Sequence, residues 1–436
     1  MSGSLLIKDS LANKISYYHL LLFMASLPFD MFYSHIILIS YGIHTLIQLK
    51  KGAIKPVSKL RIAILQSVFF VTVLSTIYTI NRNVAYQEWG KQITILLFPL
   101  LFCLNPLDIK KYRPQLLTAF ALVCTATIIY LYIDALIIIR HYHLPVSMLF
   151  SFYFTNHNFS QPIAIHATFF SMQIALALIY TLSVFIKERS LYPKLFYLCC
   201  CGVLSAGIIQ LGSKSVFIAL LVLINLAIPY FLLKGTARRR FILIAASLTV
   251  LVIAGILSSG NFRDRYVKGF KNDLSKTVAG ENDDTRLARW NVSLQLIGRA
   301  PLIGYGAGSE IGLLQDNFFN KKLYSSYLNR LNTHNEYLSF LLKSGAVGLL
   351  IYLATIAFGF TISVRYKDLF FFTFMVLVAF VSMSENLLDV DKGIIFYAFF
   401  FSFFTFSNKE PKALPETLKI DLNNQIKATK QLVVAS

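Results

Sequence analysis

The sequence predicts an all-α, polytopic membrane protein with about 12 transmembrane helices. Hydrophobic residues make up 56% of the 436 residues and charged residues only 14%, and the mean hydropathy is +0.62. A soluble domain carries about 25% charged residues, so this chain has too little charge for a soluble surface. Apolar stretches of roughly 20 residues also recur along the chain, a length that crosses the hydrocarbon core of a bilayer.

The expected membrane spans follow one another closely, except for one long connection before the last three. Only residues 28–31 separate the first two spans, which are short. The N-terminal region lacks a small-residue cleavage site after its first apolar run, so the first span is expected to be retained. The spans are expected near 15–28, 32–49, 61–80, 91–104, 115–139, 161–186, 194–211, 215–233, 240–258, 336–363, 368–385 and 393–407.

Basic residues recur in every second connection between these spans. This is the pattern of the positive-inside rule, which places such connections in the cytoplasm. Both termini are therefore expected to be cytoplasmic. The basic positions are Lys50, Lys51, Lys55, Lys59 and Arg61; Lys110, Lys111 and Arg113; Lys187, Arg189 and Lys194; Lys234, Arg238, Arg239 and Arg240; Arg365 and Lys367; and Lys409, Lys412, Lys419, Lys427 and Lys430.

The same topology explains the formal net charge of +20. Most basic residues lie between the apolar stretches, so membrane lipids are expected as partners and nucleic acid is not. The cysteines are Cys103, Cys124 and the run at 199–201, all inside or beside apolar stretches. Their spacing matches neither a disulfide framework nor a metal site, so no metal is expected.

The longest outward-facing connection, residues 259–335, divides the chain into its expected parts. These are an N-terminal transmembrane bundle (1–258), an outer loop with short helices (259–335), C-terminal transmembrane helices (336–408) and a cytoplasmic tail (409–436). The outer loop is basic, and long loops cross membranes regardless of charge. It is therefore either a solvated domain or an anion site at the outer surface, and composition does not separate the two.

A helix is expected within this loop at 285–297, with Asp283, Asp284 and Thr285 as candidate N-cap residues. Arg286 and Arg289 lie three residues apart on it, so they share a face and can both reach one anionic group. Glycines at 304, 306 and 308 predict a flexible turn after the helix, and are weak evidence for phosphate binding. The apolar face expected from helical spacing consists of Leu287, Trp290, Leu294 and Ile297.

His334 and Asn335 stand where the outer loop enters the next span. Gly345 and Gly348 follow in that span, at a spacing that lets helices approach closely. His334 is either an interfacial histidine bonded to a carbonyl or a base at the mouth of a membrane cavity. Histidine accepts a proton from a hydroxyl near neutral pH.

These elements together resemble the signatures of the O-antigen ligase and O-antigen polymerase superfamily. The first is His334–Asn335 followed by the glycine pair, and the second is Arg286 with Trp290 and the segment PLIGYGAG at 301–308. The third is LGSKSVFIALLV at 211–222, where the family usually has Ser-Arg and this chain has Ser-Lys, with Lys214. The hydropathy pattern and the long penultimate loop fit the family over nearly the whole chain.

The resemblance implies a GT-C-type membrane glycosyltransferase of the bacterial inner membrane, with a periplasmic active site and without metal or cofactor. Its donor would be a glycan on undecaprenyl pyrophosphate, and its acceptor a sugar hydroxyl of lipid A-core or another glycan. By position, His334 would activate or orient the acceptor hydroxyl. Lys214 and Arg286 would bind the pyrophosphate, with Arg289 as a helper; lysine keeps the charge of the family arginine and loses its bidentate geometry.

Other polar residues are weaker candidates. His157 and His166 are expected to line the substrate cavity, as is Asn335. Asp134 lies within an apolar span, where a charge is costly, and has no assigned role. A carboxylate base stays open among Glu88, Glu385, Asp389 and Asp391.

The favoured function is that of an O-antigen ligase. A polymerase of the same superfamily shares every feature used here and is the nearest alternative. A transporter of lipid-linked sugars would more often show internal repeats, and the clustering of candidate residues at one face favours an enzyme.

Overall fold

A computed structural model describes residues 5–49, 59–273, 275 and 284–408. The cytoplasmic tail expected at 409–436, the lysines at 50, 51 and 55, and Asp283 lie outside these residues. All regular structure within them is helical, which confirms the all-α prediction. The helices are α1 (Leu11–Ser26), α2 (Met31–Ile47), α3 (Lys59–Ser75), α4 (Arg82–Leu104), α5 (Ile109–His141), α6 (His157–Ser160), α7 (Ala167–Lys187), α8 (Leu191–Leu211), α9 (Lys214–Val222), α10 (Ile228–Leu232), α11 (Gly235–Ser258), α12 (Gly260–Arg263), α13 (Gly269–Asp273), α14 (Arg286–Ile297), α15 (Glu310–Asn320), α16 (Tyr324–Leu328), α17 (Glu336–Arg365), α18 (Leu369–Val381) and α19 (Asp391–Ser407).

Every expected apolar stretch coincides with a helix, although some ends differ. The helix α7 begins at Ala167 and not at 161, because residues 157–166 form short turns in which Ala164 has a left-handed backbone. The helix α18 ends at Val381, so residues 382–385 are free to enter the site described below. The segments that are long and apolar enough to cross a membrane, by length and composition, are α5, α7, α8, Lys214–Leu232, α11 and α17. They indicate a multi-pass membrane protein.

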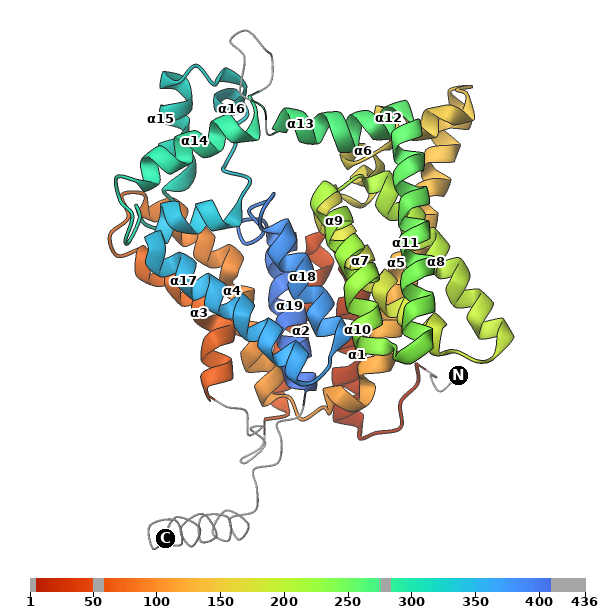
Figure 1. Cartoon of the computed structure of the whole chain (residues 1–436). Helices are drawn as coiled ribbons and strands as arrows, with labels where there is room; N and C mark the ends of the chain where they lie inside the picture. The colour runs from red at the N-terminus through yellow and green to blue at the C-terminus, as the bar shows by residue number, and fades with distance from the viewer. Residues whose placement is uncertain (1–4, 50–58, 274, 276–283, 409–436) are drawn as a thin grey trace, which may run out of the picture.

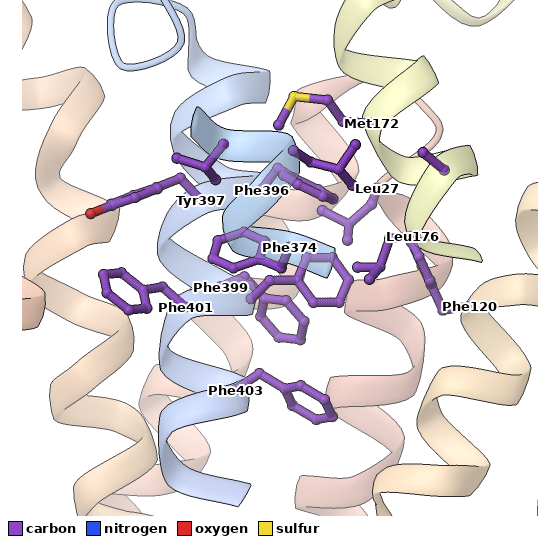
Figure 2. Packing of buried hydrophobic residues seen from close by; sticks show 14 of the residues in the cluster. Leu27, Phe120, Met172, Leu176, Phe374, Phe396, Tyr397, Phe399, Phe401 and Phe403 are labelled. Atoms are coloured by element: carbon purple, nitrogen blue, oxygen red, sulfur yellow. The ribbon is translucent and has the colours of Figure 1, made fainter. Parts of the chain in front are cut away.

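Phenylalanine side chains of α19 hold the centre of the bundle together (Figure 2). The ring of Phe399 lies 4.7 Å from that of Phe23 in α1 and 5.4 Å from that of Phe98 in α4, measured between centroids. On the neighbouring face, Phe400 lies 5.2 Å from Phe120 in α5. Such pairs add about 0.5–1.5 kcal/mol each to the free energy of unfolding beyond the area that they bury. The helix α19 therefore fixes α1, α4 and α5 relative to one another.

The residues expected to form the outer loop make a small helical cap over one end of the bundle. Figure 1 shows α14, α15 and α16 together at this end, with α12 and α13 running across it. We call it the capped end. The helix expected at 285–297 is confirmed, and the Thr285 hydroxyl accepts a hydrogen bond from the Ala288 amide at 3.2 Å.

The expected apolar face of this helix was wrong in part: Ile297 is buried as expected, but Leu294 is not. Leu294 is 53% exposed, whereas Val292 and Leu296 are buried against α15 and α17 together with Arg289. Both sets of apolar residues follow helical spacing, so the packing partner decides which set is buried.

A break in α17 joins the cap to the bundle. Gly345 has a φ of 61° inside the helix, and the carbonyls of Leu342 and Lys343 are freed to accept hydrogen bonds from the amides of Tyr305 and Gly306, each at 2.8 Å. A Cβ atom at Gly306 would lie 2.5 Å from that of Thr79 in the segment after α3. The glycine turn is therefore a close backbone contact, in place of the flexible turn expected from the sequence.

Candidate active site

A polar cavity of about 350 Å³ lies at the capped end, where α9, α13 and α14 meet the 382–390 segment. Three cationic side chains and two carboxylates contribute to its wall. Cations outnumber carboxylates, so the cavity favours an anionic ligand. The charged residues are Lys214, Arg265, Arg286, Asp273 and Glu385.

One carboxylate bridges two of these cations. Asp273 Oδ2 lies 2.8 Å from Lys214 Nζ, and Asp273 Oδ1 lies 3.7 Å from Arg286 Nε. All three side chains keep between 23% and 29% of their surface exposed. A carboxylate that bridges a lysine and an arginine accepts the same kind of charge-assisted hydrogen bonds that a phosphate group would accept in its place.

The third cation belongs to the turn between α12 and α13. Arg265 donates from Nε to the carbonyl of Gly212 at 3.3 Å, at the left-handed residue that ends α8. Burial lowers the pKa of Arg265, yet arginine stays protonated. Arg265 therefore adds positive charge beside the start of α9, where Lys214 is the first helical residue.

The opposite side of the site carries a histidine–carboxylate pair. His334 Nδ1 lies 3.3 Å from Glu385 Oε2, and Thr168 donates to the other oxygen of Glu385 at 3.5 Å. Burial raises the pKa of Glu385, but the hydrogen bond and the charge of His334 outweigh burial and hold that pKa below its usual value. An ionised carboxylate on Nδ1 leaves the Nε2 atom of His334 to accept a proton.

The backbone around this pair is tightly held. His334 has a φ of 46°, which is uncommon for a residue with a Cβ atom and persists only where the surroundings impose it. The surroundings are a pair of buried residues, Glu310 and Asn386, which we call the clamp.

The clamp links the segments that carry His334 and Glu385. Glu310 Oε1 accepts from the Thr333 amide at 2.9 Å and from Asn386 Nδ2 at 3.0 Å. Asn386 Oδ1 accepts from the Thr333 hydroxyl at 3.0 Å and from the Asn335 amide at 2.9 Å. The residues on both sides of His334 are thus bonded to the neighbour of Glu385.

A buried ion pair supports the clamp from below. Asp389 accepts from Asn386 Nδ2 at 2.9 Å through one oxygen and from Lys343 Nζ through the other. Lys343 lies in α17, two residues before the break at Gly345, and its Nζ is also 3.8 Å from Glu88 Oε1 of α4. Burial raises the pKa of Asp389, but the adjoining ammonium of Lys343 outweighs burial and holds the pKa below its usual value. Breaking such a buried pair costs about 3–5 kcal/mol of folding free energy, so this arrangement is rigid.

The two other candidate histidines lie together beside the pair. The rings of His157 and His166 are 4.0 Å apart, and His157 lines the polar cavity. Burial, followed by the charge of His166, lowers the pKa of His157 to about 4. His157 is therefore neutral at physiological pH, and its Nδ1 accepts from the Ala167 amide at 3.3 Å.

Neither Arg289 nor Asn335 lines the polar cavity, and His166 and His334 are not among its lining residues either. Arg289 is 5% exposed, and its Nε and Nη1 atoms have no hydrogen-bond partner among the described residues. Burial, with the charge of Arg286, lowers the pKa of Arg289 to about 10. Asn335 caps α17, accepting from the Leu338 amide at 3.2 Å. Both lie behind the site.

Sequence reasoning missed Asp273, Glu310 and Asn386, and gave Arg265 no particular role. Glu385 stood among several open carboxylates. Each acts through a contact that spans tens of residues, such as the 51 positions between His334 and Glu385. The one available signal was that these polar residues fall at the ends of apolar stretches on the side where His334 lies.

A comparison with protein families identifies the central part of the chain. Residues 199–353 match a family model described as O-antigen ligase. The match begins within α8 and ends within α17, so it includes Lys214, Arg286, Arg289 and His334. No curated protein matches the chain significantly. The resemblance inferred from the motifs is confirmed: residues 199–353 of the chain match the O-antigen ligase family model.

Proposed function

We propose that the protein is a membrane glycosyltransferase that moves a glycan from undecaprenyl pyrophosphate to a sugar hydroxyl, as an O-antigen ligase with lipid A-core as acceptor. The observation that carries the proposal is a cation cluster in the wall of the polar cavity with a histidine–carboxylate pair beside it, whose carboxylate, Glu385, lines the same cavity. The first suits a pyrophosphate leaving group and the second suits a hydroxyl nucleophile.

An apolar groove beside Lys214 favours a lipid-linked donor. A cavity of about 220 Å³ lies between α9 and α11, and Lys214 is the one charged residue in its wall. A second cavity, of about 330 Å³, shares Phe217 and Leu221 with the first and continues between α8 and α11. A polyprenyl chain in this α9–α11 groove would bring its pyrophosphate to Lys214, Arg265 and Arg286.

The proposed reaction uses no metal ion. The oxygen of the acceptor hydroxyl forms a bond to the anomeric carbon of the donor, and the bond from that carbon to the pyrophosphate oxygen breaks. His334 Nε2 takes the hydroxyl proton, and Glu385 stabilises the imidazolium that forms. The negative charge that develops on the leaving pyrophosphate is stabilised by fixed cations.

In this proposal the capped end faces the periplasm and both termini are cytoplasmic. The basic residues at the start of α5, at the ends of α7 and α17 and just after α10 lie on the other side of the bundle from the cap, which agrees with the positive-inside rule. The chain would act in the bacterial inner membrane, and its active site would meet both lipid-anchored substrates at the outer leaflet.

The alternative is an O-antigen polymerase, which uses the same donor and extends a second lipid-linked glycan. The charged cavity and the histidine–carboxylate pair serve both reactions equally. A lipid-linked sugar transporter fits less well, because a proton acceptor held beside a cation cluster has no role in moving an intact substrate.

Deleting the gene in its host and separating the surface glycolipids on gels tests the proposal. A ligase predicts loss of long-chain lipopolysaccharide and accumulation of full-length glycan on undecaprenyl pyrophosphate. Single repeat units still attached to the core would indicate the polymerase instead. An unchanged profile would contradict both and direct attention to another acceptor or to transport.

A further inference from the structure

A second cavity lies beside the candidate active site, on the side of α5. It has a volume of about 610 Å³ and is bounded by α5 and the 144–162 segment. Asn156 and His157 line the polar cavity, whereas the following residues Asn158 and Gln161 line this second one. The segment 156–161 therefore forms a wall between the two cavities and has residues facing each of them. We call the second space the α5 cavity.

The wall of the α5 cavity carries polar groups in an otherwise apolar setting. Asp134 is half-buried about two turns before the C-terminal end of the long apolar helix α5, and an ionisable residue in such a helix is costly and usually marks a functional site. The side chains of Asp134 and Gln161 have no hydrogen-bond partner within the part of the chain that the structure describes. Tyr153, also in the wall, is 68% exposed.

These groups suit a saccharide better than a phosphate or a lipid chain. A sugar ring offers hydroxyls to a carboxylate or an amide and apolar C–H faces to an aromatic ring. The single charge in the wall, that of Asp134, repels an anionic headgroup, and no cation lines the cavity to bind one. A polyprenyl or acyl chain would leave the carboxylate and the amides without partners.

Resting on the proposed function, we propose that the α5 cavity binds the terminal sugars of the membrane-anchored acceptor and presents their hydroxyl to His334. The donor occupies another side of the site, since the α9–α11 groove shares no lining residue with the α5 cavity. Two lipid-anchored substrates thereby approach the polar cavity by separate routes. Asp134 and Gln161 select the acceptor, while Lys214 and Arg286 hold the donor.

The test uses the full chain in detergent, with an undecaprenyl-pyrophosphate-linked glycan as donor and rough lipopolysaccharide, which lacks O-antigen, as acceptor. The variants Asp134→Asn and Gln161→Ala remove the polar groups. Ile138→Trp fills the cavity, because Ile138 lies in its wall. Ile137→Trp is the matched control, since Ile137 is the adjacent exposed residue and is not part of that wall.

We expect the first three variants to raise the acceptor KM about tenfold, with the donor KM unchanged, as loss of binding to one substrate requires. The control should keep both values. An unchanged acceptor KM in Ile138→Trp and Gln161→Ala, with protein that elutes as the wild type does, would overturn the inference while leaving the proposed function in place. A raised donor KM would likewise overturn it, by assigning the cavity to the donor. Absence of any transfer by the wild-type chain would overturn the proposed function, and the inference with it.

Discussion

The two charged clusters of the capped end are built in opposite ways. The clamp residues and Lys343 are almost fully buried, with Glu310 3%, Asn386 2% and Lys343 6% exposed, and the Asp389 side chain is 20% exposed. Their polar groups bond to one another across several segments. The cluster of Lys214, Asp273 and Arg286 is partly open, and its cations outnumber its carboxylates. A closed network fixes geometry, whereas an open one with excess charge is able to take up a ligand.

This difference assigns separate tasks to the two sides of the site. The closed side holds His334 in a strained backbone next to Glu385, and in the proposed function it would prepare a proton acceptor before the substrate arrives. The open side keeps its positive charge incompletely neutralised until an anion enters. Substitutions on the closed side and on the open side should therefore change the kinetics of transfer in different ways.

The largest effect is expected from His334→Ala. Loss of a general base typically costs about 10²–10⁴-fold in rate, so transfer should fall below detection in the reconstituted assay. Membrane insertion should stay intact, because the side chain supports no helix contact. His141→Ala, at the exposed end of α5, is the matched control. Wild-type transfer by the His334 variant would remove the catalytic assignment.

A loss of about 10²–10³-fold is expected from Lys214→Ala, the usual cost of removing one charge-stabilising donor. Lys214→Arg should keep most of the activity, since it restores the family residue and the charge. Lys268→Ala is the control, because Lys268 pairs with Asp264 at the surface, with its side chain 62% exposed. If Lys214→Ala transferred at the control's rate, the cation cluster would not be the pyrophosphate site.

The closed side can be tested separately with Glu310→Gln. Loosening the clamp should draw Glu385 away from His334 and lower the rate about tenfold, the equivalent of about 1.4 kcal/mol in the barrier. The pKa of Glu385 is held down by His334 against the effect of burial, so separation should raise that pKa. His334 needs an ionised Glu385 to act as a base. As the pH is lowered, the variant should therefore lose activity at a higher pH than the wild type does.

The acidic limb of the pH–rate profile is the measurement that separates positioning from simple destabilisation. Ser339→Ala removes the hydroxyl that donates to Glu310 from α17 and leaves the bonds to Thr333 and Asn386 in place. It should lower thermal stability without moving the acidic limb. If the acidic limb had the same apparent pKa in both variants, Glu310 would support only the stability of the fold and would not position Glu385.

The comparison of the two sides also explains what the sequence could predict. Helices were predictable because apolar stretches and caps such as Thr285 are local features. Lys214, Arg286 and His334 were recognisable because each sits in a short motif. The clamp was not predictable, since Glu310 and Asn386 are 76 positions apart and meet only because α17 breaks at Gly345 and docks the cap on the bundle.

The prediction of the buried face of α14 was partly incorrect for a related reason. Leu294 and Leu296 both fit a helical stripe, and the choice between them depends on where α15 and α17 lie. Burial of the charged Arg289 on the same face runs against any hydropathy argument. Functional regions are where such local rules are expected to be violated.

The smallest effect is expected at Asp273, which bridges the two cations of the open side. If its carboxylate stands where a phosphate of the donor binds, Asp273→Asn should free both cations and tighten inhibition by inorganic pyrophosphate by about threefold to tenfold, within the range of one charge-assisted contact. The turnover number should change little. Asp264→Asn is the matched control, since Asp264 pairs with Lys268 at the surface. Weaker inhibition in the Asp273 variant would mean that this carboxylate orients the cations for the ligand and does not compete with it, and the open side would then be as preorganised as the closed one.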